Sequence, residues 1–179
     1  MRQKNTDANP RHGRGRGGRG GRGCSGAQFR ELLSRFATGV TIVTAVDEDG
    51  NAHGMTASSL ASVSLEPPLL SVCVAKNADF HQVLRRAARF AVNVLAAGQD
   101  DLARAFSSTD VDPFKDLHVD ENDGLPFLGD TAASISCELW DCVEAGDHTI
   151  FIALVLGGEV RDGGGGPLIH YRSKYTTTR

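Results

Sequence analysis

The chain has 179 residues, 40% hydrophobic and 23% charged, a composition typical of one globular domain with its own core. No apolar run approaches the roughly 18 residues of a membrane-spanning helix, and the N-terminus lacks the apolar segment of a secretory signal. We therefore expect a cytoplasmic protein with no membrane partner. The four cysteines include no Cys-x-x-Cys pair, which favours buried free thiols over a disulfide or a metal site. If Cys137 and Cys142 share a strand, their spacing predicts opposite faces.

The first 26 residues differ in charge from the rest of the chain. They carry seven Lys and Arg against one Asp, a net charge of +6 that leaves −9 for the remainder. Arg-Gly repeats with no apolar residue capable of anchoring a core predict a disordered extension over 1–26 and a folded domain over 27–179. A −9 domain repels nucleic acid, so only the extension is a candidate for RNA binding. The GxGxxG match at 13–18 lacks the preceding strand of a dinucleotide site, and we interpret it as false.

The folded part is predicted to begin with a helix and a hairpin. Ser25 followed by Gln28 forms a capping box, and apolar residues at helical spacing predict a helix to residue 39. Those apolar residues are Phe29, Leu32, Leu33 and Phe36. Residues 40–46 are β-branched and alternating, and Asp49-Gly50 predicts a hairpin turn into a second strand.

This second strand, expected over 54–68, is the segment on which the site hypothesis rests. The sequence of 54–68, GMTASSLASVSLEPP, is rich in small and hydroxylated residues. Small side chains let a ligand approach the backbone, and hydroxyls both donate and accept hydrogen bonds. The pattern by itself favours the alternative, a half-buried strand with a polar outer face.

The middle of the chain alternates strands with short helices. Residues 69–75 form a continuous apolar run, which predicts a strand buried on both faces. Asp79 is the expected cap of a second helix whose Arg85, Arg86 and Arg89 are solvated. A strand over 90–95 and a short helix from Asp100 follow. The Asp-rich residues 107–130 predict an irregular excursion or lid.

The last part predicts an antiparallel pair and a closing strand. Residues 132–143 and 149–160 alternate on either side of a turn at 144–147, and a short strand covers 167–171. Six or seven strands with hairpin links and three short helices favour an antiparallel closed barrel. A doubly wound α/β fold is disfavoured because strands seldom alternate with helices here.

Several linked motifs resemble the flavin reductase family with the FMN-binding split-barrel fold, the small reductase components of two-component monooxygenases. The motifs are FATGVT (36–41), SVSLEPP (62–68), FAVNVL (90–95), Gln99 with Leu102-Ala103 and Phe106, GDH (146–148), and PLIHY (167–171) with Tyr175. The resemblance covers about Phe29 to Tyr175. It implies a mainly β, antiparallel split β-barrel of Greek-key type with a few short helices. It also implies a homodimer, because two subunits form the flavin cleft in this family.

No nucleophile with its base, paired catalytic acids or metal cluster occurs in the sequence, which favours chemistry borrowed from a cofactor. The resemblance implies flavin contacts from two strand segments, a helix end and the C-terminus. These residues are Thr56, Ala57, Ser58, Ser59, Cys73, Val74, Ala75, Lys76, Phe106, Ser107 and Tyr171. Lys76 is the expected phosphate cation. Core packing is an equal alternative for Phe106, and a subunit contact is an alternative for Tyr171.

His148 is the expected catalytic residue. The turn places its imidazole beside Asp147, which can fix the tautomer or raise the imidazole pKa. In the family such a histidine lies where the nicotinamide enters, whereas His53, His81, His118 and His170 lack a neighbouring carboxylate in the pattern. The resemblance thus implies an NAD(P)H:flavin oxidoreductase that uses NADH or NADPH to reduce FMN or FAD, with a monooxygenase as its partner. The alternatives are a flavin-binding protein without turnover and an RNA-binding protein acting through the Arg/Gly extension.

Overall fold

The computed structural model describes residues 23–108, 112–115, 117, 119–122, 124–161 and 165–178. The expected disordered extension over 1–26 therefore lies almost wholly outside the described residues. His118 lies outside them as well.

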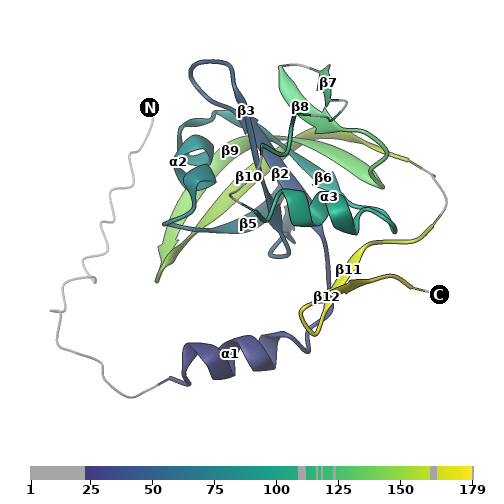
Figure 1. Ribbon diagram of the computed structural model, residues 1–179. Coiled ribbons are helices and arrows are strands. Elements are labelled where there is room, and N and C mark those ends of the chain that lie inside the picture. The colour runs from purple at the N-terminus through teal and green to yellow at the C-terminus, as the bar shows by residue number, and fades with distance from the viewer. Residues whose placement is uncertain are drawn as a thin grey trace, which may run out of the picture.

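One seven-stranded antiparallel sheet forms most of the molecule (Figure 1). Its strands follow the order β3-β2-β6-β9-β10-β5-β4. In chain order they are β2 (Thr41–Val46), β3 (Ala52–Ala57), β4 (Ala61–Leu65), β5 (Pro68–Ala75), β6 (Arg89–Val94), β9 (Ala133–Ala145) and β10 (His148–Val160). The described residues also contain three short helices, α1 (Gly26–Leu33), α2 (Asp79–Arg86) and α3 (Asp100–Ala105). The predicted mainly antiparallel β architecture with a few short helices is confirmed.

Two small sheets flank this large one. β1 (Thr38–Gly39) pairs with β11 (Ile169–Tyr171), which pairs with β12 (Lys174–Thr176). β7 (Val119–Asn122) and β8 (Leu125–Leu128) form a hairpin in the region that we expected to be irregular. The first helix ends well before residue 39 because Thr38 and Gly39 pair with β11.

The predicted strand over 54–68 is wrong as a single element. Residues 52–57 form β3 and residues 61–65 form β4, and these two strands are the opposite edges of the large sheet. The bend lies at Ser58, where the chain leaves its pairing with β2 to begin pairing with β5. The alternation expected along the whole segment therefore stops at Ala57.

β2, and not β5, is the strand buried on both faces. Val43 packs in a core cluster with Val72, Phe90 and Phe151, whereas Ile42 packs in a second cluster with Phe106. The second cluster exists because β8 covers the outer face of β2, where the Thr44 hydroxyl donates to the Pro126 carbonyl.

β5 instead alternates between buried and half-buried residues. Leu70, Val72 and Val74 face the core, and Ser71 and Cys73 face outward. The apolar run over 69–75 therefore predicted the strand correctly and its burial wrongly, because only the inner face of β5 packs against other side chains.

The cysteines show how a bulge changes the face of a strand. Asp141 pairs with Ile152 and Leu139 pairs with Ala153, so Trp140 is an extra residue in β9. Cys137 and Cys142 consequently both pack against the first cluster, and the prediction of opposite faces is wrong. Burial raises the pKa of the Cys137 thiol to about 12. All four thiols are free as expected, but Cys24 is exposed.

The helix caps agree with the sequence at α1 and differ at α2. The Gln28 N–H donates to the Ser25 hydroxyl at 3.2 Å, which confirms the predicted cap. In α2 the cap position is Ala78, and Asp79 is the first helical residue. Arg85 and Arg86 are exposed as predicted, whereas Arg89 lies half-buried in β6. No helix of the described part of the chain is long and apolar enough to cross a membrane.

Candidate functional site

Lys76 and His148 lie at the same end of the large sheet. Lys76 directly follows β5, and His148 opens β10 opposite Ala75. The Lys76 N–H donates to the Asp147 carbonyl at 3.0 Å, which fixes the end of β5 to the β9–β10 turn. Register partners place their side chains on one face of a sheet. Ala75 and His148 therefore share the outer, half-buried face, together with Cys73 and Ile150 two residues further along.

Two hydrogen bonds fasten the predicted 56–59 segment to this strand. The Ser59 hydroxyl donates to the Cys73 carbonyl at 3.1 Å and accepts the Cys73 N–H at 3.0 Å. The segments 56–59 and 73–76 consequently lie side by side. The side chains of Ala57 and Val74 point into the core and are closed to a ligand, and the Ala57 carbonyl accepts the Thr41 hydroxyl at 2.8 Å. Ser58 is exposed at the bend.

Thr56 connects the same segment to α3. Its hydroxyl donates to the Ala103 carbonyl at 2.7 Å, and its N–H donates to the Phe106 carbonyl at 3.2 Å. The Ser107 hydroxyl donates to that same Ala103 carbonyl at 2.7 Å. The end of α3, with Phe106 and Ser107, is thus held against β3 as the site hypothesis requires.

The ring of Phe106 belongs to the second core cluster. It is 4% exposed and lies against Gly54, where an added Cβ would come within 2.7 Å of the ring. It also makes an edge-to-face contact with Phe114, with a centroid separation of 5.0 Å. These contacts correspond to the core-packing alternative for this residue.

Tyr171 lies apart from these segments. It pairs with Lys174 in the β11–β12 hairpin, and the neighbouring Arg172 N–H donates to the Ser34 carbonyl behind α1. The structure therefore does not bring Tyr171 to Lys76 or His148. The same hairpin does meet Ser107 across a pocket of about 430 Å³. This pocket is lined by Arg104, Ser107, Ser108, His170, Ser173, Lys174 and Tyr175.

Two residues that the sequence reasoning did not assign to the site contact Lys76 or its partner. Lys76 Nζ lies 2.6 Å from Glu144 Oε2, and Arg85 Nη1 lies 2.9 Å from Glu144 Oε1. The pKa of Glu144 is lowered to about 2, chiefly by the hydrogen bond from Lys76 and to a lesser degree by the hydrogen bond from Arg85. Glu144 was expected only as a turn residue and Arg85 only as a solvated side chain. Nothing in their spacing signals that the fold brings them together.

His148 has the predicted carboxylate beside it. Its Nδ1 lies 2.8 Å from Asp147 Oδ1, and this hydrogen bond lowers the pKa of Asp147. A proton held on Nδ1 by Asp147 leaves Nε2 of the neutral ring as an acceptor. The prediction that the other histidines lack such a neighbour is wrong for His53, whose Nε2 lies 2.8 Å from Asp47 Oδ2. His81 is buried, with Nε2 at 2.9 Å from the Thr149 hydroxyl.

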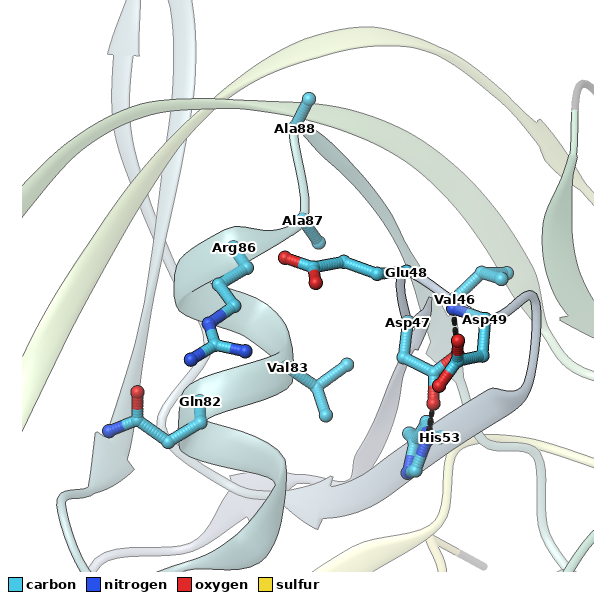
Figure 2. A pocket seen from close by; sticks show the side chains of 10 residues that line it. All are labelled: Val46, Asp47, Glu48, Asp49, His53, Gln82, Val83, Arg86, Ala87 and Ala88. Atoms are coloured by element: carbon cyan, nitrogen blue, oxygen red, sulfur yellow. Dashed lines mark hydrogen bonds and ion pairs between the residues drawn. The ribbon is translucent and has the colours of Figure 1, made fainter.

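A pocket of about 440 Å³ lies between the β2–β3 turn and α2 (Figure 2). Arg86 and Glu48 project from its opposite walls, and the His53–Asp47 pair lies at its edge. None of the residues predicted to bind flavin line it. No cluster of His, Cys, Asp or Glu that could hold a metal occurs among the described residues.

Comparison with known proteins identifies relatives along nearly the whole described chain. Residues 33–179 match the family described as "Flavin reductase like domain". The chain is 42% identical over 153 residues to a Rhizobium meliloti protein named "Probable flavin reductase", covering 84% of this chain but only about half (48%) of that protein. It is 37% identical over 149 residues to the reductase component of a Rhodococcus opacus 4-nitrophenol 4-monooxygenase/4-nitrocatechol 2-monooxygenase, covering 83% of this chain and 79% of the relative.

The fold also matches a solved relative that contains nucleotide fragments. The NADH:FAD oxidoreductase SgcE6 of Streptomyces globisporus C-1027, in complex with NAD and FAD fragments, superposes with a TM-score of 0.80 at 35% identity. The match covers 86% of this chain and 92% of SgcE6.

Proposed function

The chain belongs to the flavin reductase-like domain family, and from this premise we propose how its own residues serve the family's reaction. The protein is an NADH-dependent flavin reductase that supplies reduced flavin to a monooxygenase partner. Bound flavin supplies the redox chemistry, because its isoalloxazine ring accepts the hydride that NADH donates. The tasks of the protein are to bind both nucleotides, orient them and exclude water. Because the reaction consumes NADH, we place the protein in the cytoplasm.

The main support for the proposal is that residues 56–59 and residues 73–76 lie side by side, with the cation of Lys76 at the end of the second segment. The Ser59–Cys73 bonds hold residues 56–59 beside residues 73–76, and Lys76 stands at the end of this surface. Backbone N–H and C=O groups of these segments match the hydrogen-bonding edge of an isoalloxazine ring. The Lys76 ammonium matches the flavin phosphate. Ser59 contributes by fixing the two segments, since its hydroxyl is already engaged by Cys73.

His148 then serves the nicotinamide. It lies across the β5–β10 pair from Ala75, one residue from the proposed phosphate cation, with Asp147 restricting its ring. A half-exposed imidazole with a defined tautomer can hydrogen-bond a nicotinamide carboxamide without first losing a buried contact. His148 would thus hold and orient the nicotinamide of the hydride donor.

We also propose that the working unit is a homodimer. Helix α1 has no buried residue, and its apolar face, extended to Phe36, is between 48% and 69% exposed. Figure 1 shows α1 standing apart from the large sheet. A helix of 8 residues is marginal in water without tertiary contacts, so this face requires a partner surface. A second copy offers exposed apolar side chains on β4, β9 and β10, namely Val63, Leu65, Trp140, Val143, Leu156 and Val160.

The direct test of the proposed function is NADH oxidation by purified protein with and without added flavin. We expect oxidation that depends on FMN or FAD, and a comparison of the two flavins and of NADH with NADPH will define the preferred pair. Flavin binding without NADH oxidation would favour the non-catalytic alternative. Absence of both, with salt-sensitive RNA retention through the Arg/Gly extension, would favour the RNA-binding alternative.

Light scattering tests the dimer. We expect twice the chain mass, and a monomeric mass for a Leu32→Glu variant, because a carboxylate cannot be buried unpaired on the apolar face of α1. The matched control is Glu31→Gln, an exposed neighbour on the same helix. A monomeric wild type that binds flavin fully would overturn the dimer proposal.

A further inference from the structure

Glu144 spans two cations that come from different parts of the fold. Its Oε2 lies 2.6 Å from Lys76 Nζ after β5, and its Oε1 lies 2.9 Å from Arg85 Nη1 in the last turn of α2. Lys76 Nζ also donates to the Gly146 carbonyl at 2.9 Å. One carboxylate thus uses both oxygens to hold an ammonium and a guanidinium on either side of it.

The two ion pairs are open to solvent. The side chains of Lys76, Glu144 and Arg85 are 39%, 51% and 50% exposed. Exposed ion pairs contribute little net stability, because solvent screens them and the long side chains lose freedom. The carboxylate can therefore leave its place between the cations at small cost to the fold.

A phosphate group can make the same two contacts as the Glu144 carboxylate. Like the carboxylate, it presents two oxygens from one centre, and it adds a third oxygen and up to one further negative charge. Arginine binds such oxygens through its planar fork, and lysine binds them as a point charge. With Glu144 displaced, Lys76 and Arg85 together form a site for a phosphate monoester or diester.

We propose that Glu144 is a specificity-determining residue that competes with the flavin phosphate for Lys76 and Arg85. The proposal rests on the function proposed above, in which Lys76 faces that phosphate, and it adds Arg85 as a second phosphate ligand. Glu144 lowers the affinity for phosphorylated flavins, FMN and FAD, and has no such effect on riboflavin, which lacks the phosphate. This weakening suits a reductase that must release its reduced flavin to a partner.

The test measures binding of FMN and riboflavin by quenching of flavin fluorescence, so no turnover is needed. For Glu144→Gln we expect FMN to bind about three- to tenfold more tightly and riboflavin affinity to stay unchanged, because the amide keeps the shape and loses the charge. Glu159→Gln is the matched control. Glu159 is also an exposed glutamate paired with an arginine, at the far end of β10, and its substitution should change neither affinity.

Arg85→Ala provides an independent variant if Glu144→Gln proves poorly folded. We expect it to weaken FMN binding several-fold in the wild type and again in the Glu144→Gln background, while riboflavin binding is retained. Inorganic phosphate should compete with FMN more effectively in Glu144→Gln than in the wild type.

Two results would overturn the inference. One is equal changes in FMN and riboflavin affinity in Glu144→Gln, and the other is no change in FMN affinity in either variant. Failure of the proposed function is distinguishable from both, because wild-type protein would then leave NADH unoxidised whether or not it binds flavin.

Discussion

Two hairpin turns of this protein each place a histidine beside an aspartate, and the two pairs differ in what else the aspartate binds. At the β2–β3 turn, Asp47 accepts the backbone N–H groups of Asp49 at 2.9 Å and Asn51 at 2.8 Å as well as His53 Nε2. At the β9–β10 turn, the Asp147 side chain is 94% exposed and is bonded to His148. Asp47 therefore shapes its turn, whereas Asp147 orients a histidine at the rim of the candidate site.

The pKa values of the two aspartates follow the same division. The hydrogen bond from His53, and then the backbone of Asn51, hold the pKa of Asp47 far below its usual range. The pKa of Asp147 is lowered as well, chiefly by His148. A similar Asp–His distance thus accompanies a structural role in one turn and the functional role that we propose in the other, and the difference lies in the backbone donors that surround the carboxylate.

The largest effect of a substitution on stability is expected in the second core cluster, where Phe106 packs against Gly54 of β3. Phe106→Ala should lower the free energy of unfolding by about 3–5 kcal/mol, because it empties a buried ring site in the second core cluster. Chemical denaturation without flavin measures this loss. Phe114→Ala, a half-buried neighbour, should cost less. If Phe106→Ala is as stable as the wild type, the ring is not a core residue and its assignment returns to the flavin.

The next largest effect is expected on FMN binding, at the lysine beside the β9–β10 turn. Lys76→Ala should weaken FMN binding about ten- to a hundred-fold through loss of a charge-assisted phosphate contact, with little change in melting temperature. Lys115→Ala, which removes an exposed lysine, is the control. Unchanged FMN affinity in Lys76→Ala would separate the β9–β10 turn from the flavin site.

Substitution of the two histidines should affect KM for NADH differently. His148→Ala should raise KM for NADH about two- to tenfold, the range for one lost hydrogen bond, and leave flavin affinity and melting temperature unchanged. His53→Ala should leave KM for NADH unchanged. Steady-state kinetics with each substrate varied in turn give both values. Loss of flavin binding in His148→Ala would make His148 a flavin contact.

Smaller effects are expected from substitution of the two aspartates, on Tm for Asp47 and on KM for NADH for Asp147. Asp47→Ala should lower Tm by about 2–4 °C at neutral pH, because two backbone donors lose their acceptor, without changing NADH kinetics. Asp147→Ala should alter KM for NADH and leave Tm in place.

The pH dependence of the Asp47 effect follows from the lowered pKa in the folded state. Protonation is disfavoured in the fold, so the stabilisation is present above the unfolded pKa and is lost as pH falls below about 4. The Tm difference between wild type and Asp47→Ala should accordingly narrow in acid. A constant difference from pH 7 to pH 3 would contradict this role of the carboxylate.

The smallest effect is expected from the N-terminal extension. The Arg/Gly-rich sequence before the Ser25 cap carries no apolar residue that could anchor a core, so we propose that deletion of residues 1–23 leaves Tm, flavin affinity and turnover within error. Both turns would then behave as in the full chain. A lower Tm of the truncated protein would show that the extension contributes to the fold.

The sequence by itself determined the elements whose contacts are local. The Ser25 cap, the β2–β3 and β9–β10 hairpins and the Asp147–His148 pair each depend on residues close in the chain, and all are present. The linked motifs likewise indicated the family, because several short segments at the right spacing identify a shared fold.

Tertiary structure alone decided which faces are buried and which distant charges meet. Periodicity states that a strand has two faces and does not state what covers them, so the burial of β2 on both sides depended on β8. The bulge at Trp140 reversed the face of Cys142, and the bend at Ser58 sent one predicted strand to both edges of the sheet. Glu144 meets Lys76 and Arg85 only because β9, β5 and α2 end at the same place, a juxtaposition that long-range pairing creates and local pattern does not encode.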